Sequence, residues 1–152
     1  MKLKPFIKSD RIVIGLKDGD RRSVLAQLIQ PIDDGTLDDP GRFLNDLIRR
    51  EDELTTVMEN GVAFPHARSV VVRRLFIVIG IVNDGSAISF GPDPDIRSKL
   101  FFCIGVPAFA PTAHIPLLQA LANYVQDENR VEKIVASRIP SEVVKRLSTF
   151  KG

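Results

Sequence analysis

The sequence predicts a single α/β domain over residues 1–152, with a mixed central β-sheet flanked by helices on both faces. Two observations predict this fold. Apolar residues recur at helical spacing near both ends of the chain, whereas the middle holds short apolar runs rich in β-branched residues. Those middle runs are apolar without alternation, which is typical of strands buried on both faces, so helices are expected on each side of the sheet.

The first third of the chain predicts one strand and two helices. The run RIVIGL at 11–16 predicts a strand that ends at the charged turn KDGD. Residues 20–32 have helical spacing of their apolar side chains, with Asp20 as the N-cap and Pro31 as the residue that ends or kinks the helix. After a loop rich in Asp and Gly, a second helix is expected from about Pro40 to the acidic cluster at 51–53.

The middle of the chain predicts strands. GVAF at 61–64, RLFIVIGIV at 74–82 and KLFFCIGV at 99–106 are the apolar runs. AISF at 87–90 is expected to form a shorter strand, because turn-like segments flank it on both sides.

The last third returns to helical spacing. Helices are expected over 114–125, 128–137 and 140–150, with Ser141 as the N-cap of the last one. Pro116 is tolerated only in the first turn of a helix, so His114 must lie at or just before the start of the first of these helices.

Composition excludes several classes of protein. The 21 basic and 19 acidic residues give a net charge of +2, and the basic residues are scattered, so no nucleic-acid partner is predicted. The single cysteine, Cys103, lies in an apolar strand and suits a reducing compartment. The start of the chain has no apolar signal-peptide region, and the longest apolar run is too short to span a bilayer. A cytoplasmic protein without membrane insertion is expected.

One of only two histidines lies in the segment NGVAFPHAR at 60–68. Pro65 fixes its own backbone and holds Phe64 in extended geometry, so the approach to His66 is stiff. A stiff approach helps when an imidazole nitrogen must face a reaction partner, and Arg68 could reach an anion there. The simpler alternative is a surface histidine at a strand end without a chemical task.

The other familiar site types are not supported. Two histidines from distant segments are too few to ligate a metal, and neither has a metal-binding spacing. There is no GxSxG nucleophile elbow and no Gly-rich phosphate loop. His114 at a helix N-terminus would be held neutral and near any bound anion, although a histidine without a task is also possible there.

The segment RREDELTTVMENGVAFPHAR at 49–68 resembles the active-site signature of EIIA domains of the bacterial phosphotransferase system, in the fructose/mannitol class (type 2). That class includes the nitrogen-regulatory EIIA proteins. The matching positions are Arg50 and Glu51, Thr56, and the run Gly61–Arg68. The later segment HIPLLQALA follows in the family's order, so the resemblance covers essentially the whole chain.

The resemblance implies that His66 accepts a phosphoryl group from HPr, or from its nitrogen-branch counterpart. His66 would pass the group to an EIIB domain or use it as a regulatory signal. It also implies that His114 lies beside His66, that Arg50 and Thr56 hold the phosphoryl oxygens, and that no cofactor or metal is required.

Three further arginines, Arg68, Arg73 and Arg74, are expected either to form part of a docking surface or to be a solvated basic edge. The chain departs from the family pattern at 57–59, where Met58 and Glu59 replace a glycine-containing piece, a change that bears on the preference for a donor. The sequence leaves three roles open: a carrier in sugar uptake, a signalling module, and a degenerate domain that binds partners without phosphorylation. No fused EIIB segment is present in the sequence, which favours the signalling role.

Overall fold

The computed structural model describes residues 2–151 and contains a five-stranded mixed β-sheet. The strands are β1 (Ile12–Ile14), β2 (Val62–Ala63), β3 (His66–Ser69), β4 (Phe76–Ile81) and β5 (Leu100–Pro107). β4 and β5 pair antiparallel at the centre, β1 pairs parallel to β4, and β2 and β3 both pair parallel to β5. The predicted mixed sheet is confirmed.

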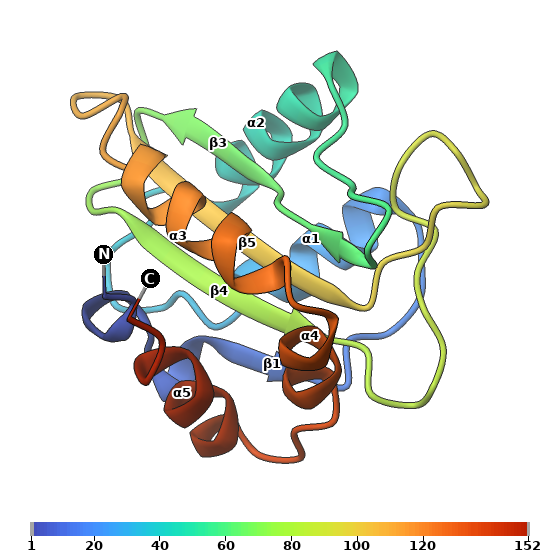
Figure 1. Ribbon diagram of the computed structural model, residues 1–152. Coiled ribbons are helices and arrows are strands. Elements are labelled where there is room, and N and C mark those ends of the chain that lie inside the picture. The colour runs from blue at the N-terminus through green and yellow to red at the C-terminus, as the bar shows by residue number, and fades with distance from the viewer. Residues whose placement is uncertain (1, 152) are drawn as a thin grey trace.

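Helices cover both faces of the sheet (Figure 1). They are α1 (Arg21–Ile29), α2 (Pro40–Glu53), α3 (Ile115–Val125), α4 (Glu128–Val135) and α5 (Pro140–Ser148), preceded by two short 3₁₀ turns at Lys4–Phe6 and Ser9–Arg11. α1 and α2 pack on one face, and α3, α4 and α5 on the other. Among residues 2–151, no helix combines the length and the apolar character needed to cross a membrane.

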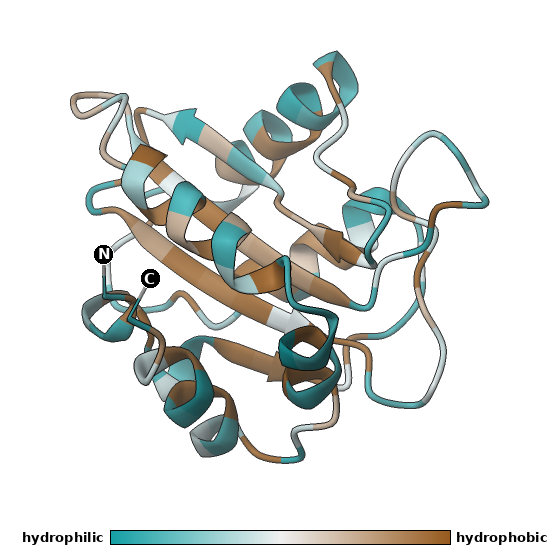
Figure 2. Cartoon of the chain, viewed as in Figure 1, coloured by the Kyte–Doolittle hydropathy of each residue, from teal (hydrophilic) through white to brown (hydrophobic). Residues whose placement is uncertain are grey.

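The sheet separates two apolar cores. In Figure 2 the central strands of the sheet are coloured mostly as hydrophobic. β4 and β5 are buried at every position, because their side chains alternate between the two cores. This is why their sequences are continuously apolar. The single cysteine, Cys103, is fully buried in β5, and burial raises the pKa of its thiol to about 12.

Helix boundaries follow local capping chemistry. The Asp20 side chain accepts the backbone N–H of Ser23 at 2.8 Å, which confirms it as the N-cap of α1, and α1 ends before Pro31. The prediction of Ser141 as an N-cap was wrong: α5 begins at Pro140, whose fixed φ suits the first helical position. The helix therefore begins two residues earlier than a Ser141 cap would place it, and Ser141 lies within its first turn.

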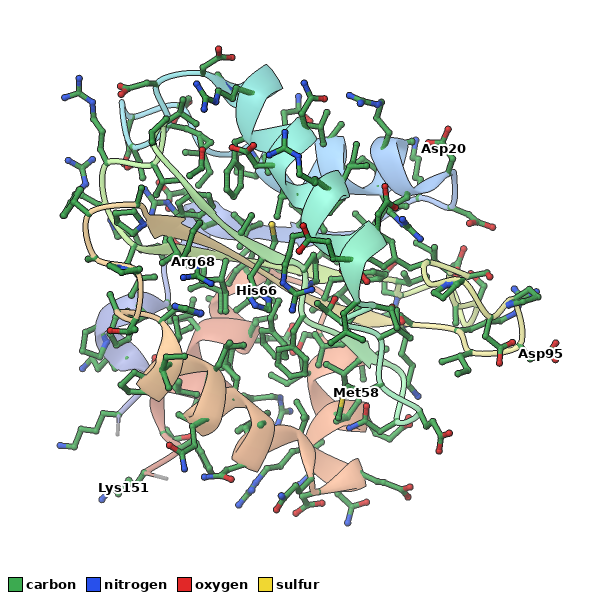
Figure 3. The ribbon with its side chains drawn as sticks, turned by 90° about the horizontal axis from the view of Figure 1, so that it is seen from above. Asp20, Met58, His66, Arg68, Asp95 and Lys151 are labelled. Carbon is green, nitrogen blue, oxygen red and sulfur yellow. The ribbon has the colours of Figure 1, made fainter. Side chains whose placement is uncertain are left out.

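Two strand predictions also need correction. AISF at 87–90 forms only an isolated bridge, between Ile88 and Ser98, within a long loop whose exposed part Asp95 marks in Figure 3. Conversely, the chain does not leave the sheet at His66. It continues as β3, a strand that the sequence did not predict because its residues HARS are mostly polar or small.

Candidate functional site

His66 is the first residue of β3, directly after the two-residue break that separates β3 from β2. β2 and β3 pair with the same strand, β5, on either side of Phe64 and Pro65. Pro65 has no N–H to donate, but its carbonyl still accepts the Ile104 N–H at 2.9 Å, so the segment stays attached to the sheet. Phe64 is buried and stacks on Phe102 with ring centroids 5.4 Å apart. The backbone entering His66 is therefore fixed by packing as well as by the proline.

The orientation of the His66 ring is set by the backbone carbonyl of Phe64, two residues earlier. Its Nδ1 lies 2.7 Å from the Phe64 carbonyl oxygen. A carbonyl can only accept, so Nδ1 carries the proton and donates it to Phe64. In the neutral ring, this leaves Nε2 with a free lone pair. The half-buried His66 thus presents Nε2 as a nucleophile.

His114 lies beside His66, as predicted. The two ring centroids are 5.6 Å apart, with the planes tilted by 38°. His114 is the N-cap residue of α3 and is 7% exposed. Its Nδ1 is buried without a hydrogen-bond partner, which is costly for a polar atom unless a ligand supplies one. The N-terminus of α3, which is the positive end of the helix dipole, thus holds the His114 imidazole beside that of His66.

Both histidines favour the neutral state. Burial is the main cause that lowers the pKa of His66, and the charges of Arg50 and Arg68 lower it further, against the opposing effects of Phe64 and Glu51. Burial also lowers the pKa of His114, followed by the charges of His66 and Arg68. A neutral imidazole at position 66 is the form that can attack an electrophile.

Two arginines face this pair of rings. Arg68 is exposed and lies two residues beyond His66 on β3, so both side chains are on one face of the sheet, and Figure 3 shows them side by side. Arg50, near the end of α2, donates Nη1–H to the Leu54 carbonyl at 2.7 Å. Its remaining donors are available to an anion, since the guanidinium carries five.

Thr56 does not offer its hydroxyl proton to the site. That hydroxyl donates to Glu51 Oε1 at 2.6 Å, and the Thr56 backbone N–H donates to Glu51 Oε2 at 2.7 Å. Thr55 Oγ1 donates to the same carboxylate at 2.9 Å. The Thr56 carbonyl in turn accepts the N–H of Phe64. Thr56 therefore links Glu51 to the backbone that orients His66.

Glu51 is the site residue that sequence reasoning missed as a functional group. It is 2% exposed and accepts three hydrogen bonds from the segment that follows α2. The available signal was the spacing: an acidic residue at a helix end, followed four and five positions later by two threonines whose hydroxyls reach back to it.

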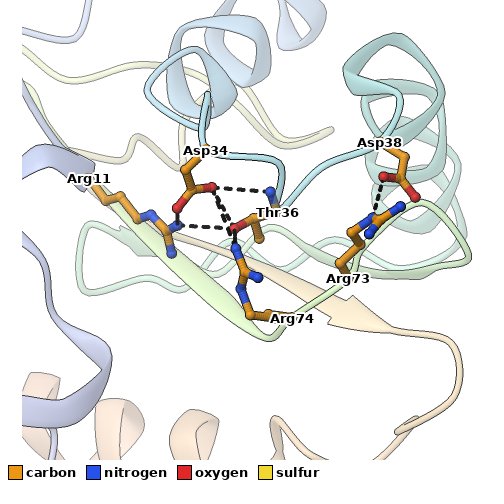
Figure 4. A network of polar contacts seen from close by, with 6 residues as sticks. All are labelled: Arg11, Asp34, Thr36, Asp38, Arg73 and Arg74. Atoms are coloured by element: carbon orange, nitrogen blue, oxygen red, sulfur yellow. Dashed lines mark hydrogen bonds and ion pairs between the residues drawn. The ribbon is translucent and has the colours of Figure 1, made fainter.

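Arg73 and Arg74 lie elsewhere, in the polar network of Figure 4. Arg73 Nε donates to Asp38, and Arg74 Nη2 donates to Thr36 Oγ1 at 2.8 Å. The buried Arg11 joins the same network through Asp34 at 2.8 Å. Hydrogen bonds from Thr36, followed by Arg11 and Arg74, lower the pKa of Asp34 to about 2. These arginines hold the loop between α1 and α2, and their part in docking stays a prediction.

An apolar hollow of about 490 Å³ lies beside His66. Its apolar lining includes Met58, Phe64, Ile115 and Leu118, and Arg50 and Thr56 stand with His66 among its polar lining residues. Met58 and Ile115 are 48% and 52% exposed. Glu59 does not line this hollow but another one, with Lys99 and Glu128, so the acidic departure from the family pattern turns away from the histidines.

Within the described residues 2–151, no three His, Cys, Asp or Glu side chains come together in a way that could hold a metal ion. The site is thus two neutral imidazoles, two guanidinium groups and an apolar margin.

Comparison with known proteins identifies the family. Residues 5–149 match the model of the family described as "Phosphoenolpyruvate-dependent sugar phosphotransferase system, EIIA 2". The chain belongs to this EIIA family. A curated relative, the fructose-specific EIIA component from Haloferax volcanii, is 32% identical over 104 residues, covering 68% of this chain and 66% of the relative. The fructose-specific EIIABC component of Bacillus subtilis is 20% identical, and the match covers 95% of this chain but only 22% of that protein.

Solved EIIA structures share the fold. The nitrogen-regulatory IIA-Ntr of Neisseria meningitidis superposes with a TM-score of 0.82 at 20% identity, covering 95% of this chain and 98% of that one. The Escherichia coli complex of enzyme IIA-mannitol with phosphorylated enzyme IIB-mannitol gives a TM-score of 0.77 at 20% identity, with the same coverages. The predicted family and fold class are confirmed.

Proposed function

We propose that this EIIA protein is a phosphohistidine carrier, in which His66 accepts a phosphoryl group on Nε2 and passes it to an acceptor protein. The observation that carries the proposal is the hydrogen bond of Nδ1 to the Phe64 carbonyl at 2.7 Å, because it dedicates the other nitrogen to nucleophilic attack. The lowered pKa of His66 keeps that nitrogen unprotonated at neutral pH.

The transfer needs positioning and charge stabilisation rather than a cofactor. The Nε2 lone pair forms the new P–N bond in line with the breaking P–N bond of the donor's phosphohistidine, whose electron pair returns to the donor ring. The proton on His66 Nδ1 stays hydrogen-bonded to Phe64 throughout.

Negative charge spreads over the equatorial phosphoryl oxygens in the transition state, and nearby hydrogen-bond donors stabilise it. Arg50 and Arg68 supply charged N–H groups, and a ring N–H of His114 supplies a neutral one. Thr56 does not donate to the phosphoryl group, because its hydroxyl donates to Glu51. It contributes indirectly, since its carbonyl accepts the N–H of Phe64, the residue that orients His66. Neither Arg50 nor Arg68 encloses the site, which suits an intermediate that must be passed on.

The proposed donor is HPr or its nitrogen-branch counterpart, and the proposed acceptor is an EIIB domain or a regulatory target. The structural neighbour from Escherichia coli, in which IIA-mannitol is in complex with phosphorylated IIB-mannitol, supports a protein acceptor. The exposed apolar margin of Met58 and Ile115 beside His66 suits a protein partner rather than a free phosphate ion. We also propose a cytoplasmic location for this protein.

Labelling by a phosphorylated donor tests the proposal. The wild-type protein is incubated with phosphoenolpyruvate, enzyme I and each HPr-type donor, and intact mass reports addition of one phosphoryl group. We expect labelling that is lost in both His66→Ala and His66→Gln, with circular dichroism reporting that the variants fold. Undiminished labelling of either variant would remove His66 from the mechanism. Absence of labelling in the wild type with every donor would favour the degenerate binding module.

A further inference from the structure

We propose a second, non-catalytic site on this protein: a basic hollow between α4, α5 and the C-terminal segment that binds a small molecule carrying two phosphate groups. The hollow has a volume of about 580 Å³, a size typical of small-molecule sites. Its charged lining residues are all cationic: Arg130, Lys133, Arg146 and Lys151. Tyr124 and Phe150 form its aromatic part.

The charges of α4 are segregated onto two sides of the helix. Arg130 and Lys133 are three residues apart and share the side that faces the basic hollow. Glu128 and Glu132 are four residues apart and line the other hollow, where Glu132 pairs with Lys99 Nζ at 2.6 Å. The acidic residues of this helix are thus turned away from its basic ones, which is not what a solvated surface with mixed charges would give.

Arg130 is held in place by cation–π contacts with two aromatic rings. Its guanidinium carbon lies 4.7 Å from the centroid of the Phe150 ring and 5.5 Å from that of Tyr124. Those two rings pack edge to face at 5.1 Å. These cation–π contacts hold the guanidinium without using its N–H groups as hydrogen-bond donors, so those groups can grip a phosphate by two hydrogen bonds. The closest carboxylate, Asp127, is 4.0 Å from Arg130 Nε.

The other three cations make no ion pair within the described residues. Lys133, Arg146 and Lys151 are exposed, and no carboxylate of residues 2–151 lies within salt-bridge distance of them. Glu142, which lines a smaller adjoining hollow with Arg146, accepts the backbone N–H of Arg138. Four like charges around one hollow repel one another, and an anion relieves that repulsion.

The charge count points to two phosphates rather than one. One phosphate can be held bidentately by Arg130 together with Lys133 on α4, which leaves Arg146 on α5 and Lys151 for a second. The site lies away from the histidines: in Figure 3, Lys151 is at the margin of the molecule and His66 near its middle. It depends on neither the proposed phosphoryl transfer nor its partners.

Nuclear magnetic resonance of the full chain with inorganic pyrophosphate as the probe tests this site. We expect saturable amide shifts in α4, α5 and residues 149–151, with a dissociation constant of about 1 mM or below at low salt. The double variant Lys133→Gln/Arg146→Gln should weaken binding by about tenfold or more. The control Lys17→Gln/Arg42→Gln removes the same charge from exposed positions near α1 and α2 and should bind like wild type.

Three results would overturn the proposal: no saturable shift in these elements, an equal loss of affinity in the control variant, or binding of inorganic phosphate as tight as that of pyrophosphate. Two further titrations test whether the hollow binds a macromolecule instead. A polyglutamate peptide or vesicles of phosphatidylglycerol that shift these residues, where pyrophosphate does not, would reassign the hollow to a protein or a membrane surface.

Discussion

The buried carboxylate of Glu51 accepts both the backbone N–H and the hydroxyl of Thr56, at 2.7 and 2.6 Å. Thr56 in turn accepts the N–H of Phe64, whose carbonyl orients His66. A chain of hydrogen bonds thus runs from the end of α2 to the proposed nucleophile. Each link is local in sequence, so the orientation of His66 is set mainly within residues 51–66.

Glu51→Gln should lower both stability and phosphoryl acceptance. The amide side chain has only one oxygen for three donors, and its NH₂ group faces N–H and O–H donors, so at least one buried donor loses its partner. We expect the free energy of unfolding, measured by urea denaturation, to fall by about 2 kcal/mol. The rate of labelling should fall by about tenfold as His66 loses its fixed orientation.

The neighbour Glu53 provides the matched control. It is exposed and makes no ion pair within the described residues, so Glu53→Gln should change stability by less than about 0.5 kcal/mol. An equal effect of the two substitutions would show that charge at the end of α2, and not the hydrogen bonds to Thr56, is what matters.

Much of the fold followed from the sequence because its signals are local. The continuously apolar β4 and β5 need burial on both faces, and Asp20 caps α1 by a contact three residues away. β3 and the 87–90 segment were misassigned for a different reason. HARS is a strand because β5 pairs with it, whereas AISF has strand-like residues but only one bridging partner, Ser98. Partners distant in sequence decided both cases.

The candidate site divides in the same way. The stiffness of the Pro65–His66 junction was visible in the sequence, and the position of His114 at the start of α3 followed from Pro116. The proximity of the two rings could come only from the resemblance, because 48 positions separate residues 66 and 114 in the sequence. Arg74 donates to Thr36 and does not reach the site. This contact depends on the path of the loop before α2, which the sequence does not indicate.

Phosphoryl acceptance should depend on pH through the His66 imidazole. Since burial and the two arginines lower the pKa of His66 below its ordinary value of 6.5, the ring stays neutral at pH 7. The labelling rate is expected to fall on acidification as Nε2 becomes protonated, with the midpoint of that fall below pH 6.5. A rate that already falls between pH 8 and pH 7 would contradict a lowered pKa for His66.

The same shifts affect stability. The pKa values of both His66 and His114 are lowered by folding, so on acidification the unfolded chain binds protons before the folded one. The free energy of unfolding should therefore decrease as the pH falls below about 6.5 and stop decreasing from this cause once both folded rings are protonated. Urea titrations of the wild type and of His66→Gln across this range would measure the contribution of His66.

His114→Leu should slow transfer to His66 without unfolding the protein. Leucine fills the buried space but has no N–H to donate to the phosphoryl group, and losing one such donor costs about a hundredfold in rate. His114→Gln restores an N–H donor and should recover part of the rate. Rapid-quench labelling measures both variants, and equal rates for wild type and leucine variant would reduce His114 to a packing role.

Arg68 and Arg73 are both exposed arginines, so substituting each in turn distinguishes an effect at the site from an effect of surface charge. Arg68→Gln removes a charge beside His66, so the pKa of His66, followed by its ring proton resonances, should rise, and labelling should slow by about tenfold. Arg73→Gln removes an equal charge that pairs with Asp38 and should leave the pKa of His66 and the rate unchanged. Equal effects of both would indicate a long-range effect of net charge.

The apolar margin beside His66 can be tested with two isoleucines of nearly equal exposure. Ile115 is 52% exposed and lines the hollow next to His66, whereas Ile139, at 53%, precedes α5 and does not line that hollow. If the hollow receives the donor protein, Ile115→Gln should raise the concentration of phosphorylated donor needed for half-maximal labelling by about tenfold. The maximal rate should be preserved, because the substitution leaves both histidines and both arginines in place. Ile139→Gln should change neither quantity; a similar increase for both variants would mean that the donor docks on another surface.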